Sequence, residues 1–128
     1  MELKTEAEIH KAICLWLDIA LPGGCIYHHS PNEALGSAKV QYRMKQKRLG
    51  VKFGWPDVEI FVNPTWWKSE TIPWAPVFLE VKSPKGRVSD NQKVVIAELI
   101  DAGCHVAIVR SVDDARDALD ELMVLRDE

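Results

Sequence analysis

The chain has 128 residues, the usual size of one domain, so the sequence predicts a single domain spanning 1–128. With 47% hydrophobic and 27% charged residues, the composition is that of a globular protein and excludes disordered and fibrous chains. No apolar run approaches the roughly 20 residues that a membrane span needs, so we expect no membrane partner. The net charge of −3 argues against a nucleic-acid partner unless the charges are segregated along the chain.

The charges are in fact separated by position. Residues 34–56 contain six basic side chains and no acid, whereas residues 113–128 contain seven acids and two arginines. A basic surface is therefore compatible with an acidic total.

The three cysteines show no C-x-x-C spacing, and the chain does not open with the cationic segment of a signal peptide. Both observations favour a reducing, cytoplasmic location, with the cysteines acting as small apolar packing residues.

The first half of the chain predicts two helices and a short strand. Thr5 and Glu8 fit a capping box, and the apolar residues that follow at helical spacing predict a helix over 5–20. Residues 25–30 are rich in β-forming side chains and predict a strand. A second helix is expected over 37–49, and it carries most of the basic cluster.

The second half alternates strands with helices. We expect, in order, a strand at 57–62, a Pro- and Trp-rich excursion at 63–76 and a strand at 77–82. A helix capped by Ser89 or Asp90 and ending at Gly103, a strand at 104–109 and a helix at 113–125 then follow. The resulting order, α β α β β α β α, is an α/β architecture. A strand, helix and strand in succession over 77–109 predict a crossover between parallel neighbours.

Three polar residues lie near the ends of two predicted strands. Asp57 begins one strand, and Glu80 and Lys82 lie near the end of the next, so antiparallel pairing would bring them to one edge of the sheet. Glu80 and Lys82 point the same way, about 6.5 Å apart along the strand. Paired carboxylates suit a hard ion such as Mg²⁺ or Mn²⁺, and a nearby lysine can orient water or stabilise charge on a phosphate. The alternative is an ordinary surface ion pair between Glu80 and Lys82.

Several short motifs occur in an order that is similar to that of a known nuclease family. They are Glu6-x-x-Ile9, His29-Ser30-Pro31-Asn32-Glu33, Leu49-Gly50-Val51-x-x-Gly54-x-Pro56-Asp57, Phe78-Leu79-Glu80-Val81-Lys82, Gly86-Arg87-x-Ser89-x-x-Gln92 and Ala102-Gly103-x-x-Val106. Over about residues 5–112 the chain resembles the VRR-NUC family of the PD-(D/E)XK nuclease superfamily, and its length resembles that of stand-alone phage and bacterial members. The resemblance implies a restriction-endonuclease-like core, which is a mixed central sheet flanked by helices. It also implies that the protein acts in the cytoplasm of a bacterium or of a phage-infected cell.

The resemblance also implies a set of metal ligands. Asp57 and Glu80 would bind the ion through their side chains, and Val81 through its backbone carbonyl. Glu6 would be the acid contributed by the first helix, because it matches the family's Glu-x-x-Ile spacing. Glu8 is the alternative on that helix, although its spacing from the capping residue favours a structural role.

Two further residues are implied to act in catalysis. Lys82 would position or activate the attacking water, and Gln92 would contact the lysine, the water of the metal or the scissile phosphate. Asn32 and Glu33 lack the arginine that often follows them in stand-alone relatives, so their role stays open.

Basic and aromatic residues are the candidates for a DNA-binding surface. The expected DNA contacts are the basic side chains of the second helix and of the loop after the strand at 77–82, namely Lys39, Arg43, Lys47, Arg48, Lys52, Lys85 and Arg87. The alternative is a merely solvated helix face and turn. Trp66, Trp67 and Trp74 could stack bases, seal a dimer or belong to the core.

Together these features predict a structure-specific DNA endonuclease that depends on Mg²⁺ or Mn²⁺ and uses no small-molecule cofactor. The similarity to stand-alone members implies a Holliday (four-way) junction resolvase that acts as a homodimer on branched DNA. The alternatives are a flap or duplex nuclease of the same superfamily and a catalytically inactive DNA-binding module. The presence of Asp57, Glu80 and Lys82 together argues against the inactive module.

Overall fold

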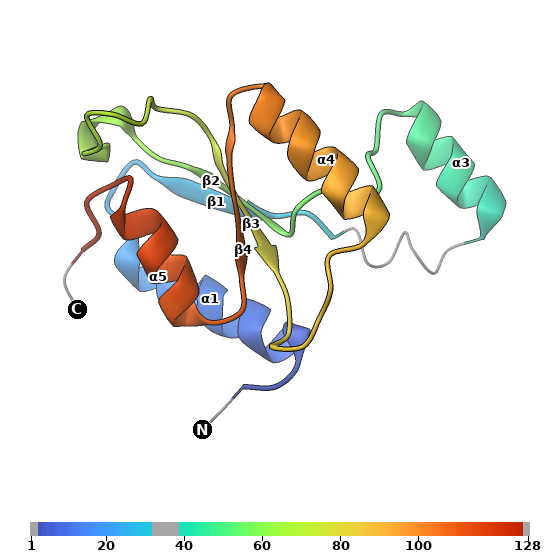
Figure 1. The fold of residues 1–128 in the computed structure, drawn as a ribbon, viewed down its shortest axis with the longest axis horizontal. Helices are drawn as coiled ribbons and strands as arrows, with labels where there is room; N and C mark the ends of the chain where they lie inside the picture. The colour runs from blue at the N-terminus through green and yellow to red at the C-terminus, as the bar shows by residue number, and fades with distance from the viewer. Residues whose placement is uncertain (1–2, 32–38, 127–128) are drawn as a thin grey trace.

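The centre of the fold is a four-stranded mixed sheet with helices on both faces (Figure 1). The computed structural model describes residues 3–31 and 39–126. The strands lie in chain order and are β1 (Ile26–His29), β2 (Val58–Phe61), β3 (Val77–Val81) and β4 (His105–Val109). The first three pair antiparallel, and β4 pairs parallel with β3. The predicted α/β class is confirmed, as are the antiparallel pairing around Asp57 and the crossover to a parallel neighbour.

The described helices are α1 (Glu6–Ala20), α3 (Val40–Arg48), α4 (Asp90–Asp101) and α5 (Val112–Asp120). α1 and α5 cover one face of the sheet and enclose the larger apolar core, while α4 covers the other face with a smaller one (Figure 1). Reciprocal capping boxes satisfy the first backbone N–H groups of α1 and α4. Thr5 caps α1 as predicted, and Ser89 is the one of the two predicted candidates that caps α4.

β3 separates the two cores by simple alternation. Val77, Leu79 and Val81 belong to the larger core under α1 and α5, whereas Phe78 packs in the smaller core under α4. Glu80 shares the face of Phe78 because successive side chains of a strand point to opposite faces. This face therefore carries the polar residues at the end of β3.

Helix α3 differs from the other described helices. α3 buries none of its residues and stands away from the sheet, beside α4 (Figure 1). Residues 37–38, at the start of the helix expected over 37–49, lie outside the described part of the chain. No helix of the described residues is long and apolar enough to cross a membrane.

The end of the chain departs from the prediction. α5 ends at Asp120 instead of continuing to 125, because Leu122 and Met123 turn inward and are buried in the larger core. The following segment pairs with the Trp-rich excursion, where the backbone N–H of Val124 donates to the carbonyl of Trp66 at 2.8 Å. The apolar spacing predicts a helix to 125, but the pairing of the last segment with the Trp-rich excursion ends α5 at Asp120.

The three tryptophans of the excursion brace this part of the fold. Trp66 and Trp67 are partly buried against the larger core, and Trp74 is 44% exposed. Each indole N–H donates to a backbone carbonyl, at 3.0, 2.9 and 2.7 Å respectively. These bonds and contacts favour the structural interpretation over base stacking.

Candidate active site

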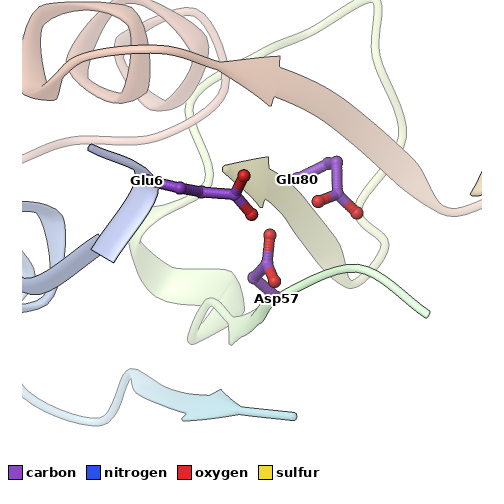
Figure 2. A group of neighbouring side chains, drawn as sticks. All are labelled: Glu6, Asp57 and Glu80. Carbon is purple, nitrogen blue, oxygen red and sulfur yellow. The ribbon is translucent and has the colours of Figure 1, made fainter. Parts of the chain in front are cut away.

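Three carboxylates meet at one end of the sheet (Figure 2). Glu6 extends from the first turn of α1, Asp57 from the turn before β2 and Glu80 from β3. One oxygen from each lies within 4.8 Å of the others. Asp57 and Glu80 are buried, with 6% and 0% of their surface exposed, whereas Glu6 is half-buried. Residues far apart in the sequence thus form one acidic cluster, the carboxylate cluster.

Backbone hydrogen bonds hold Asp57 in this cluster. Its Oδ2 accepts from the backbone N–H of Val81 at 2.7 Å. Its own carbonyl accepts from the N–H of Ser30 and contacts Nδ1 of His29, both at 2.9 Å. Because Asp57 is joined to β1 on one side and β3 on the other, its carboxylate is aimed before any ligand arrives. Asp57 itself directly precedes β2, so the strand begins one residue later than the sequence predicts.

The surroundings of the Glu80 side chain disfavour its ionised form. Among the described residues, neither of its buried oxygens receives a hydrogen bond. Burial, and then the neighbouring Asp57 carboxyl group, raises the pKa of Glu80 to about 9, while the Lys82 ammonium partly counters this. A buried carboxylate without a donor needs a proton or a cation to balance its charge.

The donor set fits a hard divalent cation. All three side chains of the carboxylate cluster offer oxygen, the ligand that Mg²⁺ and Mn²⁺ prefer, and the cluster contains no histidine or cysteine. A dication here would also satisfy the Glu80 oxygens that have no donor. Val81 lies between Glu80 and Lys82, and its carbonyl remains the predicted backbone ligand.

The geometry separates the two acids of the first helix. Glu8 accepts hydrogen bonds from the backbone N–H and the hydroxyl of Thr5, at 3.1 and 2.8 Å, and these bonds lower the pKa of Glu8. Glu8 thus serves the capping box, and Glu6 is the one that reaches the carboxylate cluster.

Lys82 and Gln92 lie differently with respect to the carboxylates. Lys82 is 93% buried, directly after β3, and near enough to Glu80 to lower the pKa of that carboxyl. Gln92 is in the first turn of α4, where its carboxamide oxygen accepts from the backbone N–H of Ser89 at 2.8 Å. The structure therefore places Lys82 beside the cluster and gives Gln92 a capping contact. Asn32 and Glu33 lie outside the described residues.

The predicted DNA contacts fall on two segments. Lys39, Lys47, Arg48 and Lys52 are exposed on or beside α3, and Arg43 is half-buried on the same helix. The other segment is the loop after β3, where Lys85 and Arg87 are exposed.

Arg110, a residue that the sequence did not single out, fixes the loop after β3. Its Nη1 donates to the carbonyls of Ser83 and Gly86 at 2.6 and 2.8 Å. The loop that carries Lys85 and Arg87 is therefore fixed to the end of β4. No local pattern in the sequence connects these two segments.

Glu59 was also missed, although it lies only two residues after Asp57. Its Oε1 accepts from the hydroxyl of Ser30 at 2.8 Å and from the indole N–H of Trp55 at 2.6 Å. The Trp55 ring in turn meets Phe78 edge-to-face at 5.5 Å. Glu59 thus ties the turn before Asp57 to its neighbours on both sides. A charged residue inside an apolar strand was the available signal.

Gly54 brings this turn against α4. Its φ of 90° favours glycine, and a Cβ here would lie 2.7 Å from the backbone of Asn91. Only a glycine lets the turn approach the helix so closely.

Comparisons with known proteins identify the family and the fold of the chain. A family model described as the VRR-NUC domain matches residues 21–113, a range that includes Asp57, Glu80 and Lys82. A solved structure named "VRR_NUC domain protein" is similar in fold, with a TM-score of 0.68 and 22% sequence identity, over 94% of this chain and 89% of that one. A search of curated proteins finds no match.

Proposed function

The chain belongs to the VRR-NUC family, which makes it a nuclease of the PD-(D/E)XK type, and we propose that it is a divalent-metal-dependent, structure-specific DNA endonuclease. The observation that carries this proposal is the carboxylate cluster: buried Glu80 oxygens without a donor face Asp57 and Glu6, beside the ammonium of Lys82. This combination of acids and a buried lysine suits phosphodiester hydrolysis better than it suits a structural ion pair.

Each residue has a proposed part in the reaction. Asp57 and Glu80, with Glu6 and the Val81 carbonyl, would hold Mg²⁺ or Mn²⁺. When bound, the ion supplies Lewis-acid stabilisation of the negative charge that develops on the phosphate. Lys82 orients the attacking water for in-line displacement at phosphorus. Gln92, at the start of α4, remains the proposed contact to that water, to the lysine or to the phosphate.

The distribution of charge supports a DNA surface on one side of the molecule. Helix α3, which carries most of the basic cluster, lies beside α4, whereas the acidic helix α5 lies on the opposite face of the sheet (Figure 1). We therefore expect DNA binding to weaken steeply with salt. The logarithm of the binding constant should fall with the logarithm of the salt concentration with a slope of about −0.9 for each phosphate contacted.

The proposed substrate is a four-way junction, cut by a homodimer. Among the described residues the chain contains one cluster of three carboxylates, so two symmetric cuts need two copies related by a two-fold axis. A flap or duplex nuclease of the same superfamily is the second candidate, and an inactive DNA-binding module is the third.

Matched four-way, flap and linear DNAs, incubated with the protein and Mn²⁺, test this proposal. We expect the junction to be cut fastest. Equal cutting of all three would reject the junction preference, and no cutting of any would favour the inactive module. A monomer in a solution mass measurement would reject the proposed homodimer.

Variants test the assignment of the site. Glu80→Gln and Lys82→Ala should abolish cleavage but leave junction binding largely intact. The exposed residues Glu70 and Lys11 provide the matched controls Glu70→Gln and Lys11→Ala, which should cut as the wild type does. Undiminished cutting by Glu80→Gln or Lys82→Ala would reject the assignment.

A further inference from the structure

A groove of about 580 Å³ runs between α3 and α4. Its volume is in the range of pockets that hold small organic ligands, about 300–1,000 Å³. Apolar side chains line part of it, among them Phe53, Val94 and Val95. Three of its lining residues are basic, and one, Glu98, is acidic. A ligand that fits this lining has an apolar body and carries negative charge.

Phe53 and Arg43 give the groove a surface suited to a planar ligand. The Arg43 guanidinium carbon lies 5.2 Å from the centroid of the Phe53 ring. Aromatic rings and guanidinium planes are the side-chain surfaces on which proteins stack unpaired bases. The other two cations of the lining, Lys47 and Lys52, are exposed and can reach a phosphate.

The groove is close to the carboxylate cluster. Phe53 precedes Asp57 by four residues, which limits their separation to about 14 Å, or roughly four base steps of B-DNA. Asn91 of α4 also lines the groove, and Gly54 packs against the backbone of this same residue. One DNA strand can therefore contact both places.

We propose that the groove between α3 and α4 binds one unpaired nucleotide of the DNA substrate. The base stacks on Phe53 and Arg43, and its phosphate is held by Lys47 and Lys52. This inference rests on the proposed function, because it names the part of a branched or distorted DNA that the nuclease recognises. A fully paired duplex offers no such base without unstacking, so the groove would favour DNA with unpaired nucleotides.

The test measures binding without cleavage, with the full chain in EDTA. Three duplexes of one sequence are compared: fully paired, with one extrahelical adenine, and with one extrahelical abasic nucleotide. We expect the wild type to bind the adenine bulge about five- to a hundred-fold more tightly than the abasic bulge, the contribution of one base–aromatic stack. Phe53→Ala should lose this difference and bind the paired duplex as the wild type does.

Controls separate stacking from folding. Phe61 is another partly exposed phenylalanine, at the far end of β2 from Asp57, so Phe61→Ala should retain the preference for adenine. Phe53→Leu keeps the apolar bulk and should also lose the preference, which covers the case in which Phe53→Ala does not fold. A 2-aminopurine placed at the bulge should be quenched by the wild type, because stacking quenches its fluorescence.

Equal affinity of the wild type for the adenine and abasic bulges would overturn the inference, as would an equal loss on all three DNAs in both Phe53 variants. Either result would mean that the groove does not recognise the unpaired base. Failure of the proposed function looks different: the wild type would then cut no DNA with Mn²⁺, whatever its preference among bulges.

Discussion

Replacing Glu80 by glutamine is expected to stabilise the metal-free protein while it abolishes cleavage. The Glu80 carboxyl group is fully buried without a hydrogen-bond donor, and burial, followed by the effect of Asp57, raises its pKa from 4.5 to about 9. Near neutral pH the folded chain must keep a proton that the unfolded chain releases, or else bury a second negative charge. A glutamine at this position needs neither, and its amide can donate to Asp57.

The size of the effect follows from proton linkage. Because the folded-state pKa is raised, the penalty is absent below about pH 4.5 and grows as the pH rises towards 9. At pH 7, about 2.5 units above the ordinary pKa of 4.5, ionisation of Glu80 stabilises the unfolded chain by about 3 kcal/mol relative to the folded one. Asp57 shares the charge and Lys82 offsets part of it, so we expect about 1–2 kcal/mol. For a chain of this size that is a rise of about 3–10 °C in Tm.

Thermal melts followed by circular dichroism in EDTA, at about pH 5 and about pH 8, measure this directly. The gain of Glu80→Gln over the wild type should be larger at the higher pH. Millimolar Mn²⁺ should reverse the order, because an ion bound to the native carboxylates stabilises only the wild type appreciably. The exposed-site variant Glu70→Gln should follow the wild type throughout. If metal-free Glu80→Gln instead melts below the wild type at about pH 8, the reasoning is refuted.

Three further predictions concern the supports of the site. Glu59→Ala removes the acceptor of the Trp55 indole N–H and should lower the free energy of unfolding by about 1–3 kcal/mol in urea titrations. Glu59→Gln keeps an acceptor and should lose less, so equal losses in the two variants would contradict this role. Gly54→Ala should destabilise more than Gly50→Ala in the same titrations, because both glycines have positive φ but only at Gly54 would a Cβ collide with α4; equal effects would exclude the collision as the cause. Arg110→Ala should speed amide exchange over residues 83–88 and weaken DNA binding, since the loop loses its bonds to the arginine; unchanged exchange would reject that role.

Local patterns in the sequence determined most of the secondary structure and the residues of the carboxylate cluster other than its first-helix acid. The capping box at Thr5 and the alternation over 77–82 involve residues only a few positions apart, so their consequences follow without knowledge of the fold. The alternation alone put Glu80 on the face opposite to Leu79. Antiparallel pairing of β2 with β3 then brought Asp57 alongside Glu80.

The tertiary structure alone decided which other groups join the site. The similarity to the family favours Glu6 over Glu8 by its spacing, but only the docking of α1 across the end of the sheet brings Glu6 to the carboxylates. The contacts of Glu59 and Arg110 likewise depend on segments that the chain brings together from a distance. The same holds for α5, whose end is set by backbone pairing with the Trp-rich excursion.

The physical reason for this division is the range of the interactions. Helical and strand periodicity is imposed by neighbours along the chain, so composition and spacing reveal it. Hydrogen bonds between distant segments depend on how the elements pack, which no short window of sequence contains. The net charge of −3 shows the same limit, because only the fold reveals that the acidic α5 and the basic α3 lie on different sides of the sheet (Figure 1).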